Sequence, residues 1–127
     1  MWKLGFGDGD WIEIRDEDFL HLQLDRMWNE CAQSKPRLAI LGSPDGHELY
    51  IGLGQSQSVL VMTPPSGWPS RHSIGDLAES GTISFAIGGQ TSEFPLSGAI
   101  PWNLAVKAAA EFFSTQSEPL SVQWENG

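Results

Sequence analysis

The stretch that decides the fold runs from Arg37 to Thr63 and reads RLAILGSPDGHELYIGLGQSQSVLVMT. It holds three short runs of the strand type, 38–41, 48–53 and 58–62, and turn residues separate each run from the next. Between the first two runs lies Ser43-Pro44-Asp45-Gly46. Its proline presets the first corner of a turn, and its glycine takes a positive φ without strain. The stretch therefore predicts a meander of three antiparallel strands that starts with a hairpin.

Two segments outside the meander have the spacing of amphipathic helices. The first runs from Glu17 to Gln33, and its apolar residues repeat at helical spacing: Leu20, Leu24, Met27, Trp28 and Cys31. Acidic residues at 16–18 crowd its start, where carboxylates oppose the positive end of the helix dipole, and Pro36 closes the segment. A second, alanine-rich helix is predicted from Pro101 to about Ser117.

Shorter patterns complete the fold prediction. Residues 10–14 suggest an edge strand before the first helix, residues 82–94 a hairpin turned by two glycines, and residues 120–124 a half-buried last strand. Prolines and glycines in 63–80 predict an ordered loop without a strand. We expect one α+β domain over residues 1–127, with an antiparallel sheet of about five to six strands packed against two main helices.

Composition narrows the class of partner. The 127 residues carry a net charge of -9, which argues against nucleic acid or an anionic membrane as a direct ligand and favours a basic partner. Cys31 is the only cysteine, so the chain forms no internal disulfide and no cysteine-based zinc cage, which suits a reducing compartment. The first residues, MWKLGFGDGD, lack the pattern of a secretory signal. We therefore expect a cytoplasmic protein.

A search for catalytic motifs favours a protein that is not an enzyme. His21, His47 and His72 have no spacing that suits a metal or a nucleophile, and we expect no metal and no cofactor. The segment from Gly54 to Ser58 resembles a nucleophile elbow, but serine stands where the second glycine is needed and both flanks read as strands. A hydrolase that uses Ser56 stays an alternative and requires Ser56 in an open cleft beside a histidine.

Five of the six tryptophans divide into two groups. Trp11, Trp28 and Trp124 fall in periodic patterns, which predicts that they belong to the core. Trp68 lies in the Pro/Gly-rich loop and Trp102 just inside a helix start, outside such patterns. Because exposed aromatic side chains are common anchors of protein interfaces, these two are candidates for partner binding.

The order of motifs in the second half is that of a known family. The motifs are Gly52-x-Gly54 after a strand, a Pro/Gly loop, Gly75, a hairpin ending in Glu93-Phe94-Pro95, Ile100-Pro101, an alanine-rich helix into Glu111-Phe112-Phe113, and Glu118-Pro119-Leu120-Ser121-Val122-Gln123-Trp124-Glu125. From about residue 16 to 125 the chain resembles the first family of immunity proteins of bacterial polymorphic toxin systems. It departs from the family pattern before Pro119, where Thr115-Gln116-Ser117-Glu118 replaces an expected glycine.

The resemblance implies a protein that binds the C-terminal domain of a cognate toxin inside the producing cell. The toxin that it implies first is a zinc-dependent DNA cytosine deaminase, whose basic active-site groove the acidic inhibitor would occlude. A nuclease toxin and a role as a non-catalytic adaptor subunit remain alternatives. From chemistry and expected exposure, we predict contacts at Asp45 and Glu48 in the first hairpin, Trp68 and Asp76 in the loop region, and Glu93 in the second hairpin.

Overall fold

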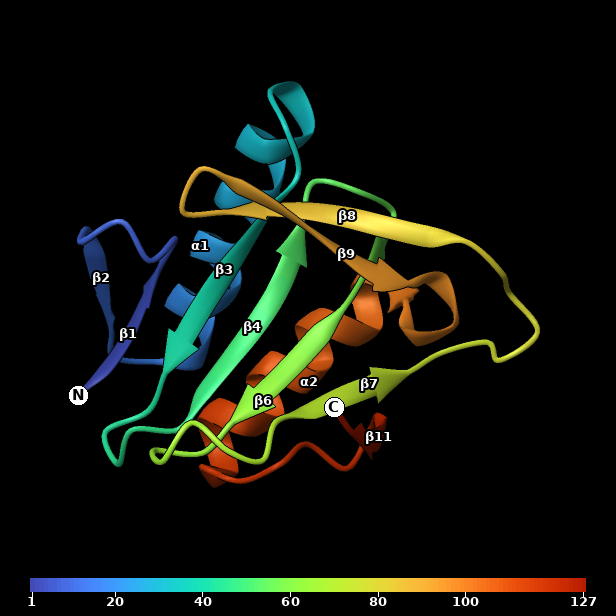
Figure 1. Ribbon diagram of the computed structural model, residues 1–127. Coiled ribbons are helices and arrows are strands. Elements are labelled where there is room, and N and C mark those ends of the chain that lie inside the picture. The colour runs from blue at the N-terminus through green and yellow to red at the C-terminus, as the bar shows by residue number, and fades with distance from the viewer.

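The computed structural model describes residues 1–127 and layers two helices, α1 (Glu17–Gln33) and α2 (Trp102–Thr115), behind an antiparallel sheet (Figure 1). A two-stranded sheet pairs β5 (Gln57–Ser58) with β10 (Ile100–Pro101), which follows a single 3-10 turn at Leu96–Gly98. The main sheet contains nine strands: β1 (Trp2–Gly5), β2 (Trp11–Ile14), β3 (Arg37–Gly42), β4 (Glu48–Leu53), β6 (Leu60–Thr63), β7 (Arg71–Ile74), β8 (Thr82–Ile87), β9 (Gln90–Pro95) and β11 (Gln123–Asn126).

The strand order separates most of the sheet from one protruding hairpin. Seven strands follow the order β11-β7-β6-β4-β3-β1-β2, and each is antiparallel to its neighbours. β8 joins β3 in parallel through the single pair Arg37 and Ala86, and β9 pairs with β8 alone. The β8–β9 hairpin therefore leaves the sheet near the start of β3 and crosses its front, on the side away from the helices (Figure 1).

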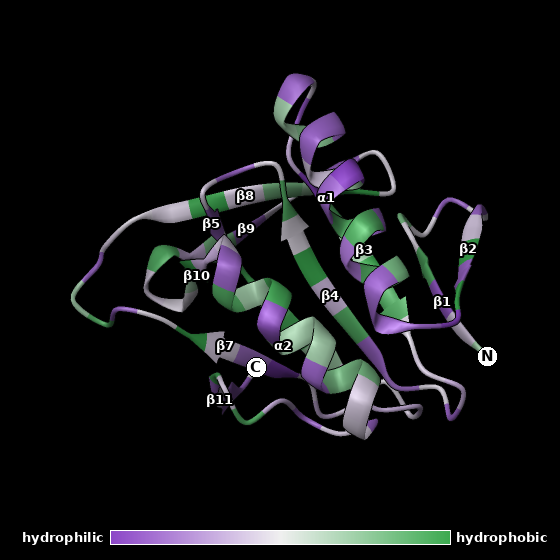
Figure 2. Cartoon of the chain, turned by 180° about the vertical axis from the view of Figure 1, so that it is seen from behind, coloured by the Kyte–Doolittle hydropathy of each residue, from purple (hydrophilic) through white to green (hydrophobic).

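Hydrophobic packing explains both layers. The main core is a cluster of 19 buried residues between the helices and one face of the sheet, with Leu24 and Phe112 from the helices and Leu41 and Leu49 from the strands. Seen from behind, α2 is largely apolar, whereas α1 carries polar residues over much of its visible surface (Figure 2). The apolar stripe of each helix covers the sheet face because burial removes it from water.

A smaller core lies on the opposite face of the sheet. Its five buried residues are Leu38, Val59, Ile83, Phe85 and Ala99, and they lie between the sheet and the β8–β9 hairpin. Phe85 lies directly over Gly52 of β4, where an added Cβ would stand 2.5 Å from the ring. Glycine at position 52 is thus what lets the hairpin approach the sheet.

The main elements predicted from the sequence are confirmed. α1 has the predicted bounds, and the Asp16 side chain caps it by accepting the Phe19 N–H at 2.8 Å. The meander appears as β3, β4 and β6, and the second hairpin as β8 and β9. The α+β class and the two main helices are therefore as expected.

Several details of the prediction were wrong. The main sheet has nine strands, more than the five to six expected, and β1 and β7 were not predicted from the sequence. β7 lies inside the segment 63–80 predicted as a loop, where it pairs with β6 and β11, strands that lie elsewhere in the sequence. The last strand begins at Gln123, and Leu120 is 94% exposed. Trp11 is on the edge strand and exposed, and is not in the core.

The departure from the family pattern before Pro119 has a visible structural counterpart. Gln116 follows α2 with φ of 57°, in the left-handed region, and is the one residue other than glycine with a positive φ. Its N–H donates to the Phe112 carbonyl oxygen at 2.7 Å, which ends the helix. Glycine adopts this conformation without the steric cost that a side chain brings.

Replacing Gln116 with glycine should therefore stabilise the protein. We expect Gln116→Gly to raise the free energy of unfolding by about 0.5–1 kcal/mol, since the left-handed strain exceeds the extra entropy of an unfolded glycine. Urea unfolding followed by circular dichroism measures the change. Lys107→Gly, at an exposed position within α2, is the control and should destabilise by a similar amount. A destabilised Gln116→Gly would contradict the strain argument.

Candidate functional site

The main sheet has one covered face and one that is only partly covered. Side chains alternate between the two faces along each strand. Those of Leu4, Leu49 and Leu60 belong to the core under the helices. Their neighbours point to the other face, where the β8–β9 hairpin covers the end near the start of β3, and Phe94 and Pro95 of β9 also lie beside His72 and Glu125. The remainder forms a surface that we call the open face.

One row of the open face crosses seven strands. Strand pairing aligns one residue from each strand, from the β2 edge to the β11 edge: Trp11, Gly5, Ile40, Tyr50, Val61, His72 and Glu125. With adjacent strands about 4.8 Å apart, this row is about 29 Å long. It is apolar or aromatic at four of its seven positions, of which Ile40 is buried and Tyr50 packs in part against the smaller core.

A second row lies two residues away along the strands and is more polar. It aligns Glu13, Lys3, Gly42, Glu48 and Thr63. Glu13 pairs with the exposed Arg15 at 3.0 Å, and Glu48 accepts a hydrogen bond from the Tyr50 hydroxyl at 3.3 Å. The open face thus places carboxylates beside its apolar row.

Aromatic rings on this face lie beside charged groups of both signs. Trp11 is 36% exposed, and Lys3 Nζ lies 4.4 Å from its ring centroid. Tyr50 is half-buried, and its pKa is raised by burial and then by the neighbouring Glu48 carboxylate. A solvated sheet face usually carries polar side chains, so the half-exposed Tyr50 and Val61 depart from that pattern.

Three of the five predicted contact residues lie at one end of the β3–β4 pair. Asp45 is in the turn between β3 and β4, Glu48 begins β4, and Trp68 lies in the loop between β6 and β7. The turn and the loop are neighbours, because a Cβ at Gly46 would stand 3.2 Å from Cβ of Pro65. We call Asp45, Glu48 and Trp68 the turn end of the molecule.

The other two predicted residues lie elsewhere. Glu93 is exposed on β9. The β8–β9 hairpin joins the sheet at Arg37, which lies at the opposite end of β3, about 17 Å along the strand from the turn. Asp76 follows β7 and lines an open groove of about 460 Å³ with Glu79 and Pro101. Sequence reasoning therefore chose exposed residues but did not group them on one surface.

Trp68 is displayed by an ordered loop. It is 69% exposed, the most exposed of the large aromatic side chains. The Gly67 N–H donates to the Pro64 carbonyl oxygen at 2.8 Å, and the Ser66 hydroxyl donates to the Trp68 carbonyl oxygen at the same distance. These local bonds fix the backbone that carries the indole, which reduces the entropy that binding would cost.

Trp102, the other tryptophan proposed for an interface, is packed inside the fold. It is half-buried, and its ring centroid lies 6.1 Å from that of Trp28. The Trp28 indole N–H donates to the Gln55 carbonyl oxygen at 3.0 Å. The two rings join α1 to α2, so Trp102 serves helix packing.

Asp45 holds the β3–β4 turn together. Its carboxylate accepts a hydrogen bond from the Ser43 hydroxyl, and its Oδ1 lies 3.0 Å from Nδ1 of His47. The bond from Ser43, followed by that from His47, holds the pKa of Asp45 well below its usual range. The proximity of Ser43, Asp45 and His47 is therefore explained by the structure of the turn. In a hydrolytic site the serine hydroxyl would face the histidine, whereas here the Ser43 hydroxyl donates to Asp45.

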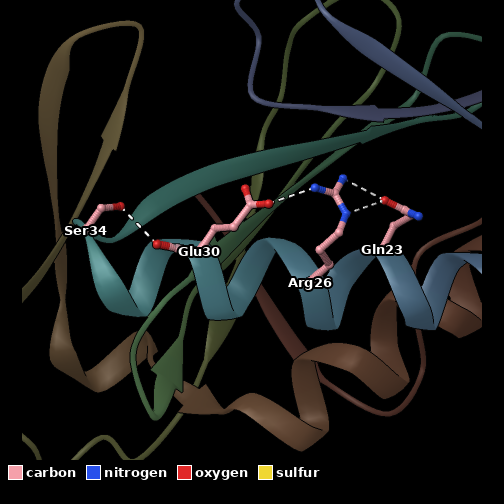
Figure 3. Close-up of polar contacts among 4 residues, drawn as sticks. All are labelled: Gln23, Arg26, Glu30 and Ser34. Atoms are coloured by element: carbon pink, nitrogen blue, oxygen red, sulfur yellow. Dashed lines mark hydrogen bonds and ion pairs between the residues drawn. The ribbon is translucent and has the colours of Figure 1, made fainter.

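On the helix side of the molecule, α1 carries one ion pair. Arg26 on α1 donates to Glu30 at 2.8 Å and to Gln23 at 2.7 and 3.0 Å, as Figure 3 shows. Arg26 and Glu30 also line a groove of about 220 Å³ beside the β1–β2 hairpin, where Asp8 lies 3.8 Å from Arg37. These pairs neutralise much of the charge in that groove.

The alternative hydrolase has little geometric support. Ser56 is exposed in the turn before β5, and no hydrogen bond joins its hydroxyl to a histidine. Ser58 is fully buried, and its hydroxyl donates to the Gly52 carbonyl oxygen at 2.8 Å. Histidine, cysteine and carboxylate side chains nowhere gather in a group of three that would hold a metal ion. Neither helix is long and apolar enough to cross a membrane.

The low pKa of Asp45 should make the stability of the turn depend on pH. Because the pKa of an unfolded aspartate is about 3.9, the ionised group stabilises the fold above that pH, and the stabilisation is lost as pH falls below about 4. Asp45→Asn should therefore unfold at a lower temperature than the wild type at pH 7, and the difference should shrink at pH 2. Ser43→Ala, which removes the bonding hydroxyl, should behave alike. Thermal unfolding across pH tests this, and a pH-independent difference would count against it.

Similarity to known proteins is found at the level of a protein family. No curated protein matches the chain. The family model of immunity protein Imm1 matches residues 11–126, which takes in every element from β2 to β11. This range includes Gly52, the hairpin that packs on it, and α2. The chain belongs to the Imm1 family of immunity proteins, whose members bind a cognate toxin.

Proposed function

We propose that this immunity protein neutralises a toxin that deaminates cytosine in DNA, by covering the basic groove in which the toxin holds its substrate. The observation that carries the proposal is the acidic excess of 16 carboxylates over seven basic side chains. An enzyme that binds DNA must contact phosphates with lysine and arginine. An acidic protein competes with the phosphates for the same cations.

The distribution of charge supports a directed interaction. Residues 8–30 hold eight of the 16 carboxylates and two of the seven basic residues. This segment forms β2 and α1 along one side of the molecule (Figure 1). An uneven charge distribution orients an approaching partner and raises the association rate, an effect that salt weakens.

The choice of a deaminase rests on the resemblance to immunity proteins of polymorphic toxin systems. Such a toxin extrudes a cytosine into a pocket where a zinc-activated water attacks the ring. A protein bound over the groove keeps DNA from the pocket without touching the zinc. A nuclease toxin is the second candidate, because its substrate groove is also basic. The family assignment makes both more fitting than an adaptor subunit.

At the turn end, we propose that Asp45, Glu48 and Trp68 contact the toxin. Protecting the producing cell requires nanomolar binding or tighter, about -12 kcal/mol. Long-range attraction speeds association, but slow dissociation requires well-packed anchors. The exposed Trp68 indole is suited to be one of them.

The target class can be tested in bacteria. The toxin domain encoded by the adjacent gene is expressed alone or together with this chain. A toxin domain whose active site has been inactivated is the control. We expect killing by the toxin alone, survival with the chain, and cytosine-to-thymine mutations that disappear when the chain is present. DNA breakage without such mutations would replace the deaminase by a nuclease. Killing that the chain does not relieve would contradict the proposed function.

Trp68 gives a second prediction. Trp68→Ala should weaken toxin binding by about 30-fold, or about 2 kcal/mol, as is typical for a central aromatic anchor. Trp68→Phe retains much of the apolar surface and should lose less. Calorimetric titration of each variant with the purified toxin domain measures Kd, and thermal unfolding checks the fold. Unchanged affinity of Trp68→Ala would place the loop outside the interface.

A further inference from the structure

We propose that the open face of the sheet is the surface on which the toxin docks, and that an arginine- and lysine-bearing surface of the toxin occupies it. The inference rests on the proposed function for the identity of the partner. It adds residues that sequence reasoning did not select, above all Trp11, Val61 and Glu13. The turn end borders this face and shares Glu48 with it.

The first argument is the apolar character of the row across the sheet. Antiparallel sheets often leave one face to water, and that face then carries polar side chains. Here the exposed Trp11 and the half-buried Tyr50 and Val61 lie in one register. Burying them against a partner would remove apolar and aromatic surface from water, which is the main source of slow dissociation.

The second argument is charge. The carboxylates of Glu13, Glu48 and Glu125 lie on this face, and Lys3 is the one lysine or arginine in the two rows. Guanidinium and ammonium groups bind both carboxylates and the faces of aromatic rings. The chain itself shows this chemistry, since Lys3 Nζ is 4.4 Å from the centroid of Trp11. A cationic toxin surface is therefore the complementary occupant.

The third argument is size. A standard protein interface buries about 800 Å² on each partner, which corresponds to a patch about 30 Å across. The row from Trp11 to Glu125 is about 29 Å long. β9 borders its last two positions, and the part from Trp11 to Val61, about 19 Å long, lies within the reach of one partner. The β8–β9 hairpin borders the face on one side and the turn end borders it on the other. The open face thus has the extent of one binding site.

Other candidates in the molecule are weaker. The outer side of α1 exposes Asp18, Leu22 and Asp25, but this is an acidic helix surface with a single apolar residue. In the groove between α1 and the β1–β2 hairpin, Arg26 is paired with Glu30, and Asp8 is paired with Arg37. The groove shares Trp11 with the open face but spans only β1, β2 and α1, whereas the open face combines apolar side chains with carboxylates across most of the sheet.

The test places a positive charge in the middle of the open face. Val61→Arg should weaken binding of the purified toxin domain at least 30-fold, since it puts a cation against a cationic partner. Trp11→Ala changes an exposed edge residue and should weaken binding at least tenfold. Ser114→Arg adds the same charge at an exposed site on α2 and is the matched control. It should stay within threefold of the wild type.

Each outcome decides the proposal. Calorimetric titration gives Kd for every variant, and thermal unfolding confirms that it folds; if Val61→Arg does not fold, Trp11→Ala alone decides. Loss of affinity at the open face with an unaffected control supports the proposal. Wild-type affinity in the face variants, or an equal loss in Ser114→Arg, overturns it while leaving the proposed function intact. A wild-type chain that neither binds nor protects refutes the proposed function itself.

Discussion

The packing of both helices on one face of the sheet is the constraint on which the rest of the structure depends. Helices α1 and α2 contribute fully buried leucine, alanine and phenylalanine side chains to a single cluster with five strands of the main sheet. Because strand side chains alternate, covering one face commits every second residue to the other. The contents of the open face are therefore a consequence of the helix packing, and a shift of one residue in register would exchange the two faces.

A single close contact then divides the second face. Phe85 occupies the space above Gly52, and this anchors the β8–β9 hairpin over one end of the sheet. The hairpin joins the sheet by one residue pair, so its position depends on this packing more than on strand pairing. The part of the face that it leaves uncovered is the part that we propose for toxin binding. Glycine in the family's Gly-x-Gly motif thus has a structural reason at position 52.

The charges of the molecule serve different purposes in different places. Asp16 caps α1, Asp45 holds the β3–β4 turn, and Arg71 pairs with Glu118 at 3.1 Å to fasten the chain after α2 to β7. These groups are explained by the fold. Carboxylates such as Glu48 and Glu125 stand on the open face, where their positions favour a basic partner. The net charge alone did not distinguish the charged groups that stabilise the fold from those that are free to meet a partner.

The sequence by itself determined the local elements and the family. Helical spacing and a capping aspartate defined α1, turn residues defined the hairpins, and the order of glycine, proline and aromatic motifs indicated the immunity family that matches residues 11–126. These features depend on residues close together in the chain. β7 was missed because its pattern is weak and its stability comes from pairing with β6 and β11.

Only the tertiary structure decided which exposed residues share a surface. Trp11, Tyr50 and Val61 lie far apart in the sequence, and strand order and register bring them into one row. The same pairing separated Glu93 from Asp45, although both are exposed carboxylates in hairpins. Local sequence reports the propensity and chemistry of each residue, whereas a binding surface is set by long-range hydrogen bonding between strands, which no local pattern contains.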